Sequence, residues 1–212
     1  DNRSAGMNPM QRAAAGGATL DKLLKAWGVE FDVSKCASDM TYKTMLSRGG
    51  RPEEAPTVLT LNKEAMDGND PVVGQLDNLL LPYAGVFSGT PVSGLTQTVL
   101  LKTSKDSMMV EKMLAEFGGG GGKDYKPDGK EKALAIRLTG KFKTAFPEGK
   151  PGSAAGEKKE GEAAPVELLK ESKVETMVVL VGDSDLLYDP VAAQVQNLFG
   201  QKIVIPQNGN LG

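Results

Sequence analysis

The spacing of apolar residues changes from a helical to a strand pattern near the start of the chain. Over residues 20–27, apolar side chains recur at i, i+3, i+4 and i+7, so they share one face of a helix. Thr19 is well suited to cap the start of this helix, and Gly28 is well suited to end it. Apolar and polar residues then alternate over residues 29–33. This stretch therefore predicts a helix followed by a strand, joined at a glycine.

Similar patterns predict further elements along the rest of the chain. Asp70-Pro71 and Asp189-Pro190 match an N-cap followed by the first residue of a helix. The run at 175–185 is rich in consecutive apolar residues, which is typical of a buried central strand in a parallel sheet. The predicted strands are 57–61, 85–87, 97–104, 133–138, 175–185 and 202–206. Helices are predicted at 70–85 and 189–200, and a helix or helical turn at 106–117.

Strands that alternate with short helices favour an α/β fold. Because the helices are short and the connections are long, we expect a mixed, mainly parallel sheet flanked by short helices. No boundary divides the sequence, so residues 1–212 are expected to form a single domain. Within it, residues 1–18 are expected to be a mobile lead-in. Gly-rich residues 118–130 and low-complexity residues 147–165 are expected to be flexible loops.

Composition excludes several classes of function. The chain contains no histidine, so it cannot form a Ser-His-Asp or Cys-His catalytic group or a histidine-containing zinc site. The net charge of −2 and the scattered basic residues argue against nucleic-acid binding. One cysteine permits no internal disulfide, and no apolar run reaches the roughly 18 residues needed to span a membrane. The composition indicates a globular protein and predicts no cofactor.

The strand predicted at 175–185 stops at the sequence Asp183-Ser184-Asp185. Ligands of open α/β sheets bind beyond the carboxyl ends of strands, so these side chains are candidate ligand-binding residues. Two carboxylates also suit a divalent cation, which leaves open a metal-assisted hydrolase or transferase that uses Asp183 and Asp185. The alternative, which we favour, is that Ser184 or Asp185 caps a short turn and Asp189 caps the next helix.

Three other features have structural explanations that we favour. The glycine run at 118–122 follows a predicted helix rather than a strand and lacks the Lys-Ser/Thr pair of a phosphate-binding loop. Cys36 is expected to be a buried, unreactive thiol. Residues 137–146 interleave basic and aromatic side chains, which suits binding to a sugar, a polyanion or a partner protein. The same pattern is expected of an edge strand with lysines outside and phenylalanines inside.

Three stretches together resemble one protein family. They are ALAIRLTGKFKTAFPEGKP at 133–151, VVLVGDSDLLYDPVAAQVQNLFGQKIVIPQNGN at 178–210 and LDKLLKAWGVEFD at 20–32. Taken along the chain, they are similar to GldG-like proteins, the auxiliary components of ABC transport systems first associated with gliding motility. The resemblance covers most of the chain.

The resemblance implies a flavodoxin-like or glutamine-amidotransferase-like fold without catalysis. It implies a domain on the periplasmic side of the bacterial inner membrane, anchored by transmembrane helices outside this chain, so that the chain is an excised part of a longer protein. The expected role is binding of a carbohydrate, an envelope component or a transporter subunit, with the permease and ATPase as partners. Asn208 and Asn210, in the closing segment, join the acidic cluster as candidate ligand-binding residues.

Overall fold

The computed structural model describes residues 20–48, 50–147, 169–187, 193–198 and 201–206. Every strand pairing in these residues is antiparallel, which overturns the predicted mixed, mainly parallel α/β sheet and with it the flavodoxin-like or amidotransferase-like fold. Parallel strands need crossover connections of a dozen or more residues, usually helices. The two described α-helices have only 6 and 5 residues, and most connections are turns.

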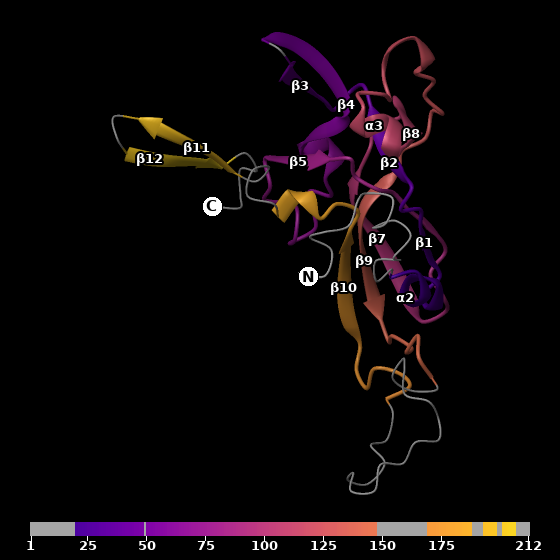
Figure 1. The fold of residues 1–212 in the computed structure, drawn as a ribbon. Helices are drawn as coiled ribbons and strands as arrows, with labels where there is room; N and C mark the ends of the chain where they lie inside the picture. The colour runs from indigo at the N-terminus through magenta and orange to yellow at the C-terminus, as the bar shows by residue number, and fades with distance from the viewer. Residues whose placement is uncertain (1–19, 49, 148–168, 188–192, 199–200, 207–212) are drawn as a thin grey trace, which may run out of the picture.

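The largest sheet is organised around strand β9 (Ala133–Gly140). β7 (Leu95–Lys102) pairs along one side of β9 and β10 (Thr176–Val181) along the other, so the three strands run side by side in Figure 1. β6 (Phe87–Gly89) joins β9 at a single position and links it to β1 (Val29–Phe31). The predicted strands at 29–33, 97–104 and 133–138 are therefore confirmed in substance.

The remaining strands form three smaller sheets (Figure 1). One pairs two strands near the short helix α3, a second contains three strands, and the third is a hairpin that extends away from the main sheet. The first contains β2 (Lys35–Asp39) and β8 (Ser107–Glu111), the second β3 (Lys43–Arg48), β4 (Arg51–Asn62) and β5 (Asn78–Pro82), and the third β11 (Ala193–Leu198) and β12 (Gln201–Pro206). The helical elements are α2 (Asp21–Ala26), α3 (Lys112–Glu116) and three 3-10 turns, η1 (Lys63–Ala65), η2 (Gly122–Asp124) and η3 (Asp185–Leu187).

Two of the three apolar clusters hold most of these elements together. The larger one lies between β4, β5, β7 and β9, and the smaller one packs α2 against the main sheet. In the smaller cluster, the ring of Trp27 meets Phe142 edge to face with centroids 4.9 Å apart, and its Nε1 donates to the carbonyl of Lys143 at 3.2 Å. The predicted first helix is thus confirmed, and Gly28 ends it with φ at 76°. Its predicted cap, Thr19, lies outside the described residues.

The predicted helix at 70–85 is wrong, and the helix or helical turn predicted at 106–117 is confirmed only in its second half. Asp70 does accept the N–H of Val72 at 2.8 Å, as a cap would, but turns follow and the chain then enters β5. Residues 106–117 form β8 and then the single short helix α3. In both places a strand pairs with a strand distant in the sequence, β5 with β4 and β8 with β2, and this tertiary pairing overrides the local helical pattern.

The last third of the chain differs most from expectation. The predicted helix at 189–200 is wrong, because residues 193–198 are strand β11, and Asp189 and Pro190 lie outside the described residues. β10 is not a central parallel strand. It lies at the end of its sheet, pairs only with β9 among the described strands, and leaves Met177, Val179 and Val181 exposed. The continuous apolar run led to the wrong prediction of a buried central strand, because alternate residues of β10 face solvent.

Candidate functional site

Gly182 positions the acidic cluster at the end of β10. Its N–H donates to the carbonyl of Leu134 at 2.9 Å, and its own carbonyl accepts the N–H of Gly85 at 2.8 Å. A Cβ at position 182 would lie 2.3 Å from the carbonyl oxygen of Gly85, far inside van der Waals contact. The glycine in the sequence Gly-Asp-Ser-Asp is therefore required by the close approach of two backbones.

Asp183 is the residue that begins the next turn. Its Oδ1 accepts the backbone N–H of Asp185 at 2.7 Å, which starts η3. The N–H of Leu187 then donates to the carbonyl of Ser184 at 3.2 Å. The capping predicted for this stretch is present, but the acceptor is Asp183 rather than Ser184 or Asp185.

The second oxygen of Asp183 has no such role. Only 8% of the residue is exposed, and Oδ2 is a buried atom without a hydrogen-bond partner. Burial is the largest influence on this carboxyl group and, together with the nearby charge of Asp185, raises its pKa to about 6. The backbone N–H groups of Asp185 and Leu186 and the charge of Lys112 oppose the rise. A buried polar atom without a partner is destabilising and calls for an explanation.

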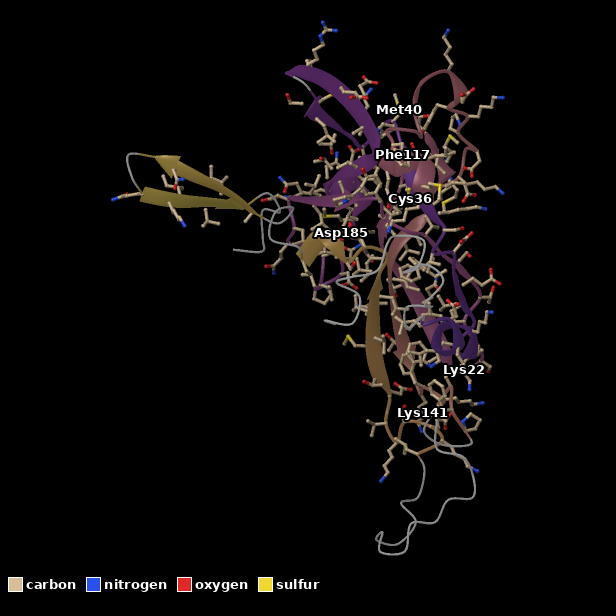
Figure 2. All side chains as sticks on the ribbon, in the orientation of Figure 1. Lys22, Cys36, Met40, Phe117, Lys141 and Asp185 are labelled. Atoms are coloured by element: carbon tan, nitrogen blue, oxygen red, sulfur yellow. The ribbon has the colours of Figure 1, made fainter. Side chains whose placement is uncertain are left out.

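Asp183 lines a cavity of about 290 Å³ that two basic residues share. Pairing of β2 with β8 brings Lys35 opposite Glu111, so Lys35 and Lys112 lie near each other, and the N–H of Lys112 donates to the carbonyl of Ser34 at 2.8 Å. Figure 2 shows Asp185 beyond the end of β10, on the side from which the β11–β12 hairpin extends. The rest of the lining is Phe31, Val33, Pro82, Tyr83, Gly85, Val181, Gly182, Ser184 and Asp185.

Tyr83 contributes an unusual backbone conformation to this cavity. It is the one non-glycine residue with positive φ in the described chain, at 55°. Its N–H donates to the carbonyl of Thr57 at 2.8 Å, which fixes the chain as it leaves β5. Strained residues of this kind cluster at binding sites, where the surrounding structure holds them in place.

The two lysines of the cavity differ in their ionic partners. Lys35 Nζ lies 3.7 Å from a carboxylate oxygen of Asp32 and 4.0 Å from one of Glu111. Within the described residues, Lys112 forms no ion pair. The arrangement therefore combines an acceptor without a donor and a cation without a counter-ion in one small cavity.

The structure places the remaining predicted residues differently. Ser184 is exposed and Asp185 is half-buried on η3, whereas Asn208 and Asn210 lie outside the described residues. In the part of the chain that is described, no group of three or more His, Cys, Asp or Glu side chains converges to hold a metal ion. Asp183 and Asp185 thus have no third side chain of these four types beside them there, and the structure adds no support to the metal-assisted alternative.

Sequence reasoning missed two other concave surfaces. A groove of about 900 Å³ lies over β6 and β7, and the side chain of Gln97 in its wall has a buried Oε1 without a partner. A second, apolar cavity of about 320 Å³ lies between β5, β7, β9 and β10. Both are assembled from strands distant in the sequence, so no local motif signals them.

The structural explanations of two other features hold. Cys36 is fully buried, and burial raises the pKa of its thiol to about 11, which favours an unreactive side chain. Along the basic and aromatic stretch, Phe142 is buried while Lys141 and Lys143 are exposed. Arg137 forms an ion pair with the buried carboxylate of Asp70. The inside–outside alternation is confirmed, but β9 is a central strand rather than an edge strand.

Comparison with known proteins gives one match. A family model described as an ABC-type uncharacterized transport system matches residues 1–211. No curated protein and no solved structure matches the chain. Among the described residues, no helix has both the length and the apolar character needed to cross a membrane.

Proposed function

Because this chain belongs to a family of ABC-type transport system auxiliary components, we propose that it is the recognition component of such a system, without catalysis of its own. Family membership associates the chain with an ABC transport system and is consistent with a non-catalytic, membrane-associated role. The proposal adds a place on the periplasmic side of the membrane and a binding function. The resemblance of the chain to GldG-like proteins supports both the location and the binding function.

One observation carries the binding function: Oδ2 of the buried Asp183 has no partner in a residue that lines a cavity. A binding site needs only a few placed polar groups in a cavity, and Asp183 and Lys112 are such groups here. Of the ligands expected from the sequence, a small carbohydrate or the end group of an envelope component fits this cavity.

The transport association is tested by co-purification of the full-length protein with the permease and ATPase encoded with it, after mild cross-linking in membranes. We expect both subunits to be enriched over an unrelated membrane protein. Their absence from the cross-linked material would overturn the transport role. Asp183→Asn is expected to leave the co-purification unchanged, since the cavity is proposed for a ligand rather than for subunit contact.

The binding function is tested separately by ligand-dependent thermal stabilisation, with extracts of the cell envelope fractionated by size. We expect a low-mass fraction to raise the melting temperature of the wild type but not of Asp183→Asn. Asp124→Asn, at an exposed position in η2, is the matched control and should behave as the wild type does. Equal stabilisation of Asp183→Asn would remove the cavity from the proposal.

A further inference from the structure

Resting on the recognition function proposed above, we infer that the cavity at Asp183 binds a small zwitterion, with its ammonium group on Asp183 and its carboxylate on Lys112. The class of ligand is an α-amino acid with an apolar side chain. Three features of the cavity lead to this class: a carboxylate oxygen without a donor, a lysine without an ion pair, and four apolar residues in the lining.

The first half of the argument concerns the group that satisfies Asp183. More than nine-tenths of this residue is buried, and one carboxylate oxygen already accepts a hydrogen bond from the backbone of Asp185. The other oxygen therefore needs a donor that enters the cavity. A hydroxyl group would donate a hydrogen bond but carries no charge. An ammonium group donates and also neutralises the charge that burial makes unfavourable. The raised pKa of Asp183 agrees with a carboxylate that lacks such compensation.

The second half concerns Lys112. This lysine begins α3 directly after β8, lines the same cavity, and has a favourable charge interaction with Asp183. Lys35 already lies near two carboxylates, so within the described part of the cavity wall Lys112 is the lysine without an ion pair. An anionic group on the ligand would give Lys112 a counter-ion. An acidic and a basic side chain on one small cavity thus match a ligand with both charges.

The size and the walls of the cavity restrict the ligand further. Its volume of about 290 Å³ is at the lower end of the range for small-molecule sites, which suits a molecule of amino-acid size. Phe31, Val33, Pro82 and Val181 supply apolar surface around the charged pair. A neutral sugar would satisfy Asp183 through its hydroxyl groups but would leave Lys112 without a counter-ion. It would also make few apolar contacts with these four residues.

The inference is tested by isothermal titration calorimetry of the protein at pH 7.5 with L-leucine as the probe. N-acetyl-L-leucine lacks the ammonium group, and L-leucinamide lacks the carboxylate. We expect L-leucine to bind and each derivative to bind at least about tenfold more weakly, since each loses one charge pair. No binding of L-leucine, or equal binding of N-acetyl-L-leucine, would overturn the zwitterion.

Variants assign each charge to its residue. Asp183→Asn is expected to weaken L-leucine at least about tenfold, and Lys112→Gln at least about fivefold. Lys112→Gln should leave the weak binding of L-leucinamide unchanged, which a general loss of structure would not. Lys105→Gln, at an exposed turn, is the control and should bind as the wild type does. Loss of L-leucinamide binding in Lys112→Gln would overturn the assignment.

D-glucose, titrated in parallel, separates failure of this inference from failure of the function on which it rests. Asp183-dependent binding of D-glucose without binding of L-leucine would overturn the zwitterion and support the recognition function. The recognition function itself can be overturned only by the envelope-extract test above, because that test does not depend on L-leucine.

Discussion

The backbone N–H of Asp185 donates to Oδ1 of Asp183 at 2.7 Å, and the other oxygen of the same carboxyl group has no partner. The two oxygens of this one side chain therefore have opposite effects on the stability of the fold. The bonded oxygen begins η3 and stabilises the fold, whereas the unpartnered oxygen makes burial of the charge unfavourable. The following predictions start from this pair.

The stability of the protein should fall as pH rises through about 6. Asp183 has a usual pKa of 3.8 and a folded-state pKa of about 6, so the folded state holds this proton more tightly than the unfolded state. The resulting stabilisation is complete below pH 3.8 and is lost as pH rises through about 6. We expect a decrease on the order of 1 to 2 kcal/mol in the free energy of unfolding between pH 5 and pH 7.5.

Urea unfolding across this pH range measures the effect, and Asp183→Asn is the test variant. Asparagine keeps an oxygen for the N–H of Asp185 but does not titrate, so the decrease should disappear. The chain contains no histidine, which removes the usual source of titration in this range. A pH dependence that persists unchanged in Asp183→Asn would contradict the prediction.

Gly182→Ala should destabilise the protein strongly. The added Cβ would lie 2.3 Å from the carbonyl oxygen of Gly85, so the two backbones must move apart and lose the hydrogen bond between them. We expect a loss of about 2 kcal/mol or more in the free energy of unfolding, measured by urea denaturation. Gly68→Ala is the matched control, because nothing lies within 4 Å of its Cβ position, and it should change stability by less than about 0.5 kcal/mol.

Removal of Arg137 should leave an unpaired buried charge. Arg137 forms an ion pair with Asp70, whose side chain is 1% exposed. We expect Arg137→Met to lower the free energy of unfolding by about 2 to 4 kcal/mol, and addition of Asp70→Asn to recover part of that loss. The exposed pair of Lys63 and Asp77 provides the comparison: Lys63→Met should change stability by less than about 1 kcal/mol. Simple additivity in the double mutant would contradict direct coupling.

The position of β10 at the end of its sheet is tested by one substitution at two valines. Val179→Thr, on an exposed position of β10, should change stability by less than about 0.5 kcal/mol. Val29→Thr, at a fully buried position of β1, should lower it by about 1 to 3 kcal/mol, because the hydroxyl group is desolvated. A large loss at Val179 would instead indicate the buried central strand predicted from the apolar run.

The sequence predicted the elements whose local pattern agrees with their tertiary surroundings. The helix that ends at Gly28 and the strand that begins at Ala133 are of this kind. Asp70-Pro71 failed as a helix start because the same residues also begin a turn, and pairing of β5 with β4 decided the outcome. The direction of the strands depends on contacts far apart in sequence, which no local period reports.

The sequence predicted only part of the candidate site, because local patterns do not report contacts between distant segments. The change from apolar to acidic residues at the end of a strand identified Asp183, and the close approach of Gly85 explains the glycine before it. Lys112 was not predicted, because it begins α3 about 70 positions earlier in the chain and reaches the site only through the fold. The unpartnered oxygen is likewise visible only once the surrounding atoms are placed.

The burial of Cys36 makes this chain convenient for optical experiments. The native sequence has one thiol, which is fully buried in the protein, and its pKa of about 11 keeps it protonated at neutral pH. A maleimide dye would therefore ignore the native residue and react with a cysteine introduced at an exposed position such as Lys202 in β12. A fluorophore there can report on the outer hairpin while ligands and partner subunits are added, without first rebuilding the core to remove a competing thiol.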